Sequence, residues 1–237
     1  MCGIFSAHGG FPPMRFGRGL KGLAPMNYRK TVTKRILVLF VIIAVLSNGL
    51  SALRFEYSED LDRIGDVGMY VSLALPGTLL FEAETEAYPS LALSYGSVIG
   101  AGYLARTVLK EAITAQRPYV GYPDAPPPRS DDYKSFPSGH ALMTFASAAY
   151  LQTAVCLWHP DSTLLKSMAV ANWILAAATS TLRVVGGSHH VHDVLAGAAI
   201  GGGLGFLGPF ITDRLQKRDR QAPRVLIGQA TGVLVSY

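Results

Sequence analysis

A succession of long apolar runs constrains the fold of this chain more than any other feature of its sequence. The runs cover residues 36–46, 67–81, 91–109, 141–158, 164–182 and 194–211. A helix needs about 20 predominantly apolar residues to cross a bilayer, and most of the runs approach that length. The chain has 49% hydrophobic and only 16% charged residues, which is too apolar for an ordinary soluble domain of 237 residues. The sequence therefore predicts an all-α membrane bundle of about six transmembrane helices.

The segment before the second run leaves more than one interpretation open. Residues 1–26 are rich in Gly, Pro and Phe without periodicity, so they form either a disordered arm or sequence ahead of a later true start. Residues 27–53 contain a basic stretch followed by the first apolar run. That arrangement is typical of a first transmembrane helix or of a cleaved signal peptide.

Basic residues near both ends of the chain predict the orientation of the bundle. Lys34 and Arg35 precede the first run, and residues 214–237 form a tail that begins with several basic residues. The positive-inside rule places both groups in the cytoplasm, which agrees with an even number of spans. We therefore expect residues 54–213 to form one multi-pass domain in the cell inner (plasma) membrane. The net charge of +5 does not indicate a nucleic-acid partner, because no basic aromatic surface accompanies it.

The segments between and within the runs differ in character. Residues 54–66 contain an acidic cluster and are expected to form a charged loop. Residues 118–136 are rich in proline and cannot be helical. Pro76 and Gly77 interrupt the second run, which a membrane helix tolerates, and the glycines of the sixth run predict close helix packing.

Two cations follow the third run. Arg117 lies seven residues after Lys110, almost two helical turns, so the two side chains are expected on one helix face about 10 Å apart. Pro118 then marks the end of that helix. The pair could bind an anion, and the alternative is two basic side chains that extend from the membrane edge to water.

The fourth run opens with Pro137, Ser138, Gly139 and His140. These residues predict a helix N-terminus whose free N–H groups could hold an anion, with a glycine that allows close approach to the backbone. His140 would be the proton donor beside that anion. The alternative is an ordinary capping turn with a solvated histidine.

The most polar segment lies between the fifth and sixth runs. Asp193 follows His189 by four residues, which is one turn on the same face if the sixth helix has begun. The aspartate could then accept the Nδ1 proton of His189 and leave Nε2 free to attack, while Arg183 binds a phosphate. His190 and His192 do not share that face and are expected at an interface or at the rim.

The same histidine-rich segment could instead hold a metal ion, since His and Asp are common zinc ligands. That alternative leaves Lys110, Arg117 and Arg183 unexplained, because three cations would repel a bound dication. A phosphate explains all three. Counted from a cytoplasmic N-terminus, all three polar segments fall on the outer face, towards the periplasm or the exterior.

Together the three segments resemble the type-2 phosphatidic acid phosphatase family. Its pattern is Lys-x6-Arg-Pro, then Pro-Ser-Gly-His, then Ser-Arg-x5-His-x3-Asp, and this chain has the same order and spacing. One position departs, because Leu182 stands where the family usually has the serine before the arginine. The resemblance covers roughly residues 65–211. The wider superfamily contains lipid phosphate phosphatases, soluble bacterial acid phosphatases and vanadium haloperoxidases.

The resemblance implies hydrolysis of a lipid phosphate monoester or pyrophosphate without a metal or other cofactor. His189 would attack phosphorus to form a phosphohistidine with Asp193 orienting it, and His140 would protonate the leaving oxygen. The residues expected to bind the phosphate are Lys110, Arg117, Ser138, Gly139 and Arg183.

Other functions stay open on the sequence alone. Within the same fold the alternatives are a vanadate-type haloperoxidase and an acid phosphatase for a soluble substrate, and a membrane anion transporter is an alternative of another class. A transporter would need charged groups near the middle of the membrane. Membrane spans favour a lipid partner, whose alkyl chains can stay in the bilayer, but the sequence does not identify which lipid phosphate.

Overall fold

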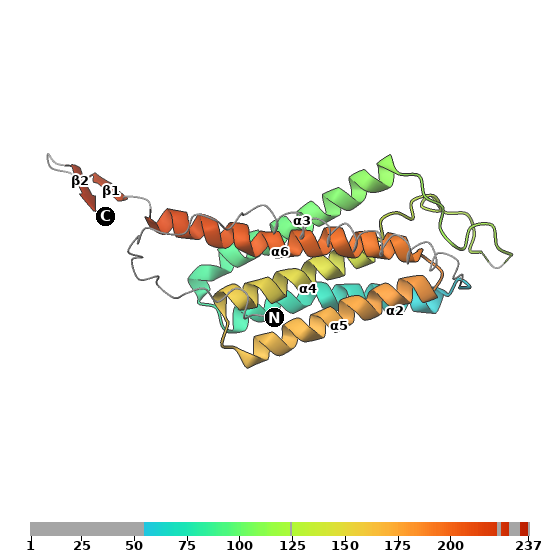
Figure 1. The fold of residues 1–237 in the computed structure, drawn as a ribbon, viewed down its shortest axis with the longest axis horizontal. Coiled ribbons are helices and arrows are strands. Elements are labelled where there is room, and N and C mark those ends of the chain that lie inside the picture. Colours follow the sequence, from blue (N-terminus) through green and yellow to red (C-terminus); the bar gives the residue numbers. More distant parts are fainter. Residues whose placement is uncertain (1–54, 124, 222–223, 228–232, 237) are drawn as a thin grey trace, which may run out of the picture. The chain divides into compact units, whose positions relative to one another are not determined.

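The computed structural model describes residues 55–123, 125–221, 224–227 and 233–236, and its regular elements are helices apart from a short hairpin (Figure 1). The elements are α2 (Glu59–Ala74), the 3-10 helices η2 (Leu75–Phe81) and η3 (Thr85–Ala87), α3 (Tyr88–Ala112), α4 (Gly139–Trp158), α5 (Thr163–Val185), α6 (Val191–Gln221), and strands β1 (Arg224–Ile227) and β2 (Val233–Ser236). The two strands pair antiparallel, with Arg224 opposite Ser236. The expected arm and first run, residues 1–53, lie outside the described residues.

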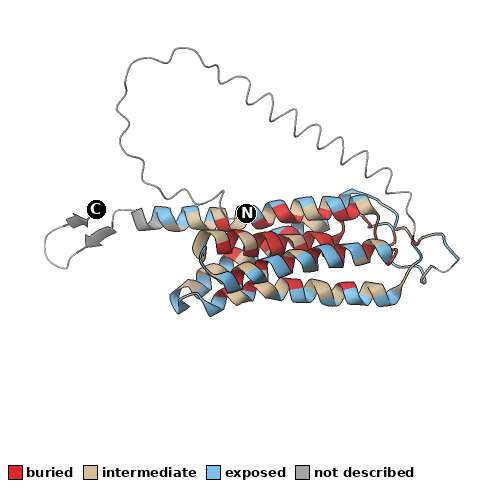
Figure 2. Ribbon diagram, turned by 60° about the horizontal axis from the view of Figure 1, so that its bottom comes forward, coloured by how far each residue is buried: buried red, intermediate tan, exposed pale blue. Residues whose placement is uncertain are grey.

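Helix α4 forms the centre of the bundle, and Figure 2 shows it buried along most of its length. Its residues are apolar or small on every face, and a helix that is hydrophobic all round is stable only when other helices cover it. Helices α2, α3, α5 and α6 all contact α4. The core therefore runs along α4, and the N-terminus of α4 is held in the middle of one end of the bundle.

Three glycines let α6 lie directly against the backbone of α4. A Cβ atom added to Gly201 would lie 1.9 Å from the carbonyl oxygen of Leu142, and one added to Gly197 would lie 2.5 Å from the carbonyl oxygen of Ser138. Gly205 is equally close to Ala146, at 2.3 Å. The close packing predicted from the glycines of the sixth run is confirmed. It brings the N-termini of α4 and α6 side by side.

Helix α2 begins earlier than the sequence predicts. The expected charged loop at residues 54–66 is wrong, because the helix starts at Glu59 after an N-cap at Ser58, whose side chain accepts a hydrogen bond from the amide of Leu61. The acidic residues occupy the first turn, where carboxylates favour the positive end of the helix dipole. Asp62 and Asp66 therefore lie one helical turn apart. At the other end, α2 tightens into the 3-10 helix η2 at the expected interruption.

Neutral polar side chains bond to one another inside the bundle. Ser72 Oγ donates to Asn172 Oδ1 at 2.6 Å, and Asn172 Nδ2 donates to Ser147 Oγ at 3.1 Å. Ser147 Oγ donates to the carbonyl oxygen of Ser72 at 2.6 Å, and Tyr95 contacts Ser147 at 3.2 Å. Such contacts tie helices together in an apolar environment. This network joins α2, α3, α4 and α5.

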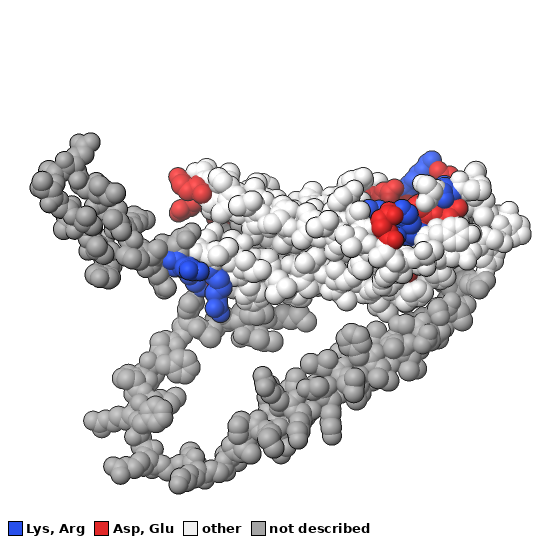
Figure 3. All heavy atoms as spheres, turned by 90° about the horizontal axis from the view of Figure 1, so that it is seen from above, with Lys and Arg blue, Asp and Glu red and all other residues white. Residues whose placement is uncertain are grey.

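Four helical segments of the described chain are long and apolar enough to cross a membrane. They are Glu59–Phe81, Gly139–Trp158, Thr163–Val185 and Val191–Arg218. On the face in Figure 3, charged side chains gather towards the two ends of the helices, with a largely uncharged surface between them. The protein is a multi-pass membrane protein with an all-α bundle. The count of six spans stays a prediction, and part of the expected tail is helical, because α6 continues to Gln221.

Candidate active site

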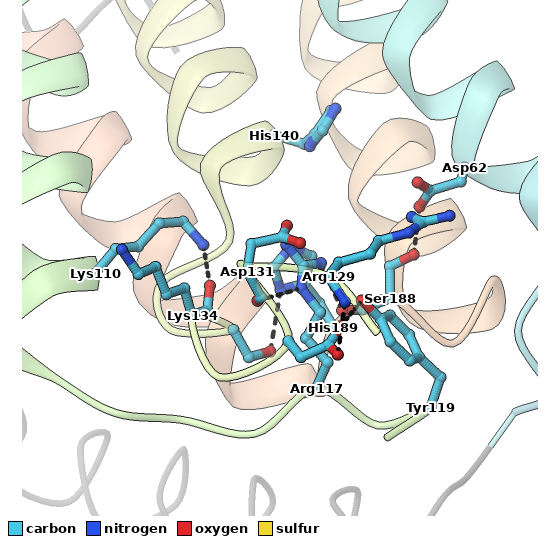
Figure 4. A network of polar contacts seen from close by, with 12 residues as sticks. Asp62, Lys110, Arg117, Tyr119, Arg129, Asp131, Lys134, His140, Ser188 and His189 are labelled. Carbon is cyan, nitrogen blue, oxygen red and sulfur yellow. Dashed lines mark hydrogen bonds and ion pairs between the residues drawn. The ribbon is translucent and has the colours of Figure 1, made fainter. Parts of the chain in front are cut away.

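The polar segments of the sequence meet at one end of the bundle. The start of α2, the end of α3, the start of α4, the end of α5 and the start of α6 all lie there (Figures 1 and 4). This end carries all eight residues expected in the site: Lys110, Arg117, Ser138, Gly139, His140, Arg183, His189 and Asp193.

His189 lies in the turn between α5 and α6 and is only 3% exposed. The amides of Ser188 and His189 both donate to the carbonyl oxygen of Arg183, at 3.1 and 3.0 Å. Gly187 adopts a φ of 69°, a left-handed conformation that glycine takes without strain, and this allows the turn. The turn therefore links the nucleophile candidate directly to the arginine at the end of α5.

Asp193 lies beside the His189 ring, although the two residues do not share a helix. Helix α6 starts at Val191, so His189 precedes it, and Asp193 lies in its first turn. His189 Nδ1 is 3.7 Å from Asp193 Oδ2. Ser135 Oγ lies between them, donating to Asp193 Oδ2 at 2.6 Å and lying 3.3 Å from His189 Nδ1. The pairing predicted from the spacing is present, and Ser135 is a member that the sequence did not indicate.

Burial leaves His189 uncharged at neutral pH. It lowers the pKa of His189 to about 3, against the opposing effect of Asp193, and the positive charges of Arg117 and Arg183 lower it further. An uncharged imidazole keeps a lone pair on one nitrogen. His189 therefore has the ionisation state that a nucleophile needs.

Two carboxylates of α2 lie in the site, and the sequence analysis did not predict them there. His140 Nε2 is 2.7 Å from Asp66 Oδ1. Arg183 Nη1 is 2.8 Å from Asp62 Oδ1 and 3.5 Å from Asp66 Oδ1. Ser188 Oγ also donates to Asp62. The start of α2 thus holds both the second histidine and the buried arginine.

Arg183 has a buried N–H donor, at Nε, that forms no hydrogen bond with the described residues. Its side chain is 5% exposed, and Nη1 makes its contacts with Asp62 and Asp66. Within the described part of the chain, its Nε atom is buried without a hydrogen-bond partner. A buried unsatisfied donor is costly, so an anion that accepted from it would be stabilised.

Arg117 reaches the site from an extended segment and not from a helix. The prediction that it shares a helix face with Lys110 is wrong, because α3 ends at Ala112 and the following residues pair with the loop before α4. The amide of Arg117 donates to the carbonyl oxygen of Asp132 at 2.8 Å. Pro118 disfavours a helical conformation at Arg117, which agrees with this path. Its guanidinium donates to Asp131 Oδ2 at 2.5 Å and to the carbonyl oxygen of Ser188 at 3.1 Å.

Lys110 lies near the end of α3 and is 8% exposed. Its Nζ donates to the carbonyl oxygen of Lys134 (Figure 4). Burial, and then the charges of Arg117 and Arg106, lower the pKa of Lys110 to about 8. A cation in this environment gains stability from a bound anion.

The N-terminus of α4 faces the same region. Ser138 is the N-cap, with its Oγ accepting from the amide of Ala141 at 3.5 Å, and its own amide donates to the carbonyl oxygen of Asp193 at 3.0 Å. The first N–H groups of a helix, here those of Gly139 and His140, have no carbonyl partner within the helix. They form a site at which an anion is favoured.

The described residues of the loop at 118–136 form no helix, as predicted, and their own side chains hold the loop in place. Tyr119 donates to Asp132 Oδ1 at 2.9 Å, and Asp132 Oδ2 accepts from the amide of Arg129 at 3.0 Å. Burial raises the pKa of Tyr119 well above its ordinary value, so its hydroxyl stays a donor. These contacts fix the conformation of the loop at this end of the bundle.

The two other histidines of the segment lie beside the site. The rings of His190 and His192 stack with centroids 5.2 Å apart, and His192 Nε2 is 3.2 Å from Asp193 Oδ1. His192 is therefore a rim residue that touches the orienting aspartate. Across the described residues, no three His, Cys, Asp or Glu side chains are grouped so as to hold a metal ion.

A family model described as the PAP2 superfamily matches residues 91–216, which is more than half of the chain. The chain belongs to the PAP2 superfamily. The resemblance that the three motifs carry is therefore confirmed.

Two solved structures are similar to this PAP2 chain. The crystal structure of Aquifex aeolicus LpxE covers 72% of this chain and 94% of its own, at 22% identity and a TM-score of 0.45. That of the first transmembrane PAP2 type phosphatidylglycerolphosphate phosphatase from Bacillus subtilis covers 78% of this chain and 97% of its own, at 20% identity and a TM-score of 0.43. A sequence comparison with curated proteins gives no match.

Proposed function

We propose that this protein is a membrane phosphatase that hydrolyses a lipid phosphate monoester or pyrophosphate through a phosphohistidine at His189. One observation carries the proposal. A buried, uncharged histidine paired with Asp193 lies among Arg117, Arg183 and Lys110, at the end of an apolar helical bundle. Membership in the PAP2 superfamily supports it further.

The first step transfers the phosphoryl group to the enzyme. Nε2 of His189 attacks phosphorus, the bond from phosphorus to the lipid oxygen breaks, and His140 gives its proton to that oxygen. Asp193 stabilises the positive charge that develops on the His189 ring. Asp66 Oδ1 lies 2.7 Å from His140 Nε2, so this carboxylate positions the ring and offsets part of the positive charge that His140 carries in this step.

The second step releases phosphate. His140, now uncharged, accepts a proton from a water molecule, whose oxygen attacks phosphorus. The bond from phosphorus to Nε2 then breaks and His189 returns to its uncharged state. Each histidine thus has its own carboxylate: Asp66 lies beside His140, and Asp193 lies beside His189.

Charge on the phosphoryl oxygens is neutralised by three cations and a helix terminus. Arg183 offers its unpaired Nε, and Lys110 exchanges the carbonyl oxygen of Lys134 for a phosphate oxygen. Arg117 exchanges Asp131 for the substrate, since that carboxylate occupies its guanidinium. The N–H groups at the start of α4 complete the set.

A lipid substrate fits the position of the site. The cluster lies at the end of helices long enough to span a membrane, so alkyl chains can stay in the bilayer while the headgroup reaches His189. The positive-inside rule predicts that this end faces outward from the inner membrane. A transporter is less well supported, because the network of Ser72, Ser147 and Asn172 inside the bundle is uncharged and its members bond to one another.

The test uses the purified full-length protein in an uncharged detergent with phosphatidic acid, measuring phosphate release with and without EDTA. We expect release by the native protein in both conditions and none by His189→Ala. His159→Ala is the matched control, because His159 lies at the opposite end of α4 and contacts Glu82. Activity that survives in His189→Ala, or that disappears with EDTA, contradicts the proposal.

A further inference from the structure

Helix α3 brings a second cation to the site that the mechanism does not use. Arg106 precedes Lys110 by four residues, so it lies one turn, about 6 Å, further along α3 towards the middle of the bundle. It faces α4 across a contact that only glycine permits. A Cβ atom added to Gly139 would lie 2.5 Å from Arg106 Nε and 3.0 Å from its Cδ. The guanidinium group of Arg106 therefore covers the backbone at the N-terminus of α4.

Arg106 differs from the other two arginines of the site in its partners. Arg117 pairs with Asp131, and Arg183 pairs with Asp62. Among the described residues, Arg106 forms no ion pair or hydrogen bond, and its guanidinium carbon lies 5.8 Å from the centre of the Tyr103 ring. Arg106 is partly buried as a residue, and burial weakens the solvation of a charged side chain unless an anion compensates for it.

Lys110 and Arg106 together form a local excess of positive charge. Lys110 donates to a backbone carbonyl and not to a carboxylate, and the charge of Arg106 acts against its protonation. Two like charges held one helical turn apart destabilise each other unless an anion lies near both. One phosphoryl group at His189 can engage Lys110 without engaging Arg106, which lies one turn further along α3.

We propose that Arg106 forms a subsite for a second phosphoryl group, which lies between the scissile phosphate and the alkyl chains of the lipid. The inference rests on the proposed function. The lipid chains extend towards the middle of the bilayer. The part of the headgroup next to the scissile phosphate therefore lies at the same depth as Arg106. Headgroups with this chemistry are a lipid diphosphate and a lipid whose phosphodiester carries a terminal phosphate. Phosphatidic acid has only the scissile group.

The subsite sets a preference among substrates. A hydrogen bond to a charged group typically changes binding by roughly tenfold or more when one partner is removed. Loss of the Arg106 charge is therefore expected to lower kcat/KM by roughly tenfold for headgroups with a second phosphoryl group. The effect on phosphatidic acid is expected to stay within about threefold, because its single phosphate is held elsewhere.

The experiment compares the full-length protein with Arg106→Gln in uncharged detergent micelles on three lipids. These are phosphatidic acid, phosphatidylglycerol phosphate and a polyprenyl diphosphate. The matched control is Arg63→Gln, which removes a positive charge from an exposed residue of α2 that pairs with Glu59 at 2.7 Å. We expect the control to change no substrate by more than twofold. A selective loss on either doubly phosphorylated lipid supports the subsite, and the lipid affected identifies its spacing.

Two results overturn the subsite while leaving the phosphatase intact. An equal fall in kcat/KM on all three lipids would assign Arg106 to the scissile phosphate. An unchanged kcat/KM on every lipid would mean that Arg106 does not contact the substrate. Binding separates this question from catalysis. In the His189→Ala background, addition of Arg106→Gln should weaken binding of the doubly phosphorylated lipid, measured by calorimetry, and leave phosphatidic acid unchanged. If His189→Ala and the double variant bind the doubly phosphorylated lipid equally well, the subsite is refuted. This conclusion does not depend on the mechanism of hydrolysis.

Discussion

Asp66→Asn tests whether α2 contributes to the chemistry of the site. The substitution keeps the size of the side chain and its ability to accept a hydrogen bond, and it removes the negative charge beside His140. Nε2 of His140 is 2.7 Å from Asp66 Oδ1, a distance typical of a charge-assisted hydrogen bond. The second contact of Asp66, with Arg183, is longer at 3.5 Å, and Asp62 remains to hold that arginine.

The expected loss follows from the geometry. A hydrogen bond to a charged group contributes about 1.5–3 kcal/mol. The Asp66 side chain is 49% exposed, so solvent screening favours the lower end of that range. About 1.4 kcal/mol in the activation free energy is a tenfold change in rate. We therefore expect kcat to fall about tenfold, with a smaller change in KM.

The assay is phosphate release from phosphatidic acid by Asp66→Asn, His140→Ala and the double variant. If Asp66 acts through His140, the double variant should be no more than about twofold slower than His140→Ala. Asp60→Asn is the matched control, because Asp60 lies in the first turn of α2 with an exposed side chain. It should leave kcat unchanged.

The reasoning is refuted by either of two outcomes. In the first, Asp66→Asn keeps kcat within twofold of the native protein, so the carboxylate does not assist His140. In the second, the substitution lowers kcat by the same factor with and without His140. That result would make Asp66 a partner of Arg183 or a structural residue.

Three further predictions concern neighbouring parts of the site. The pKa of Lys110 is lowered to about 8, so its positive charge is present below that pH and lost above it. We therefore expect kcat/KM to fall as the pH rises through about 8, and Lys110→Arg should abolish this fall. Ser135→Ala removes the 2.6 Å hydrogen bond to Asp193 and should lower kcat about tenfold without raising KM. Gly201→Ala places a Cβ 1.9 Å from a backbone oxygen of α4 and should lower the unfolding temperature by about 4 °C or more, whereas Gly202→Ala, with nothing within 4 Å, should not.

The features that were predictable from the sequence depend on neighbours along the chain. Apolar runs indicated the helices because burial in a bilayer requires continuous apolar length, and the glycines of the sixth run indicated close helix packing. The structure shows that the partner is α4. The motif spacing brought forward His189, Asp193 and Arg183, whose mutual contacts are made within a single turn and the start of one helix.

The errors occurred where contacts between distant segments overrode local pattern. Residues 113–117 have helix-compatible composition, yet they run extended because they bond to residues 132–135 of the following loop. Residues 54–66 look like a polar loop, because a helix start rich in acidic residues has the same composition as a loop.

What only the tertiary structure decided is the electrostatic partner of each functional group. Asp62 and Asp66 meet Arg183 and His140 because α2 packs against α5, where a Cβ on Gly68 would lie 2.4 Å from Thr179. Arg106 lies against the α4 terminus because α3 packs on α4 and the Arg106 side chain reaches Gly139. The sequence by itself determined a membrane helix bundle and the motifs of the PAP2 superfamily, which we expect to bind phosphate. Charge interactions depend on distance through space and not along the chain, so their pairing required the packed helices.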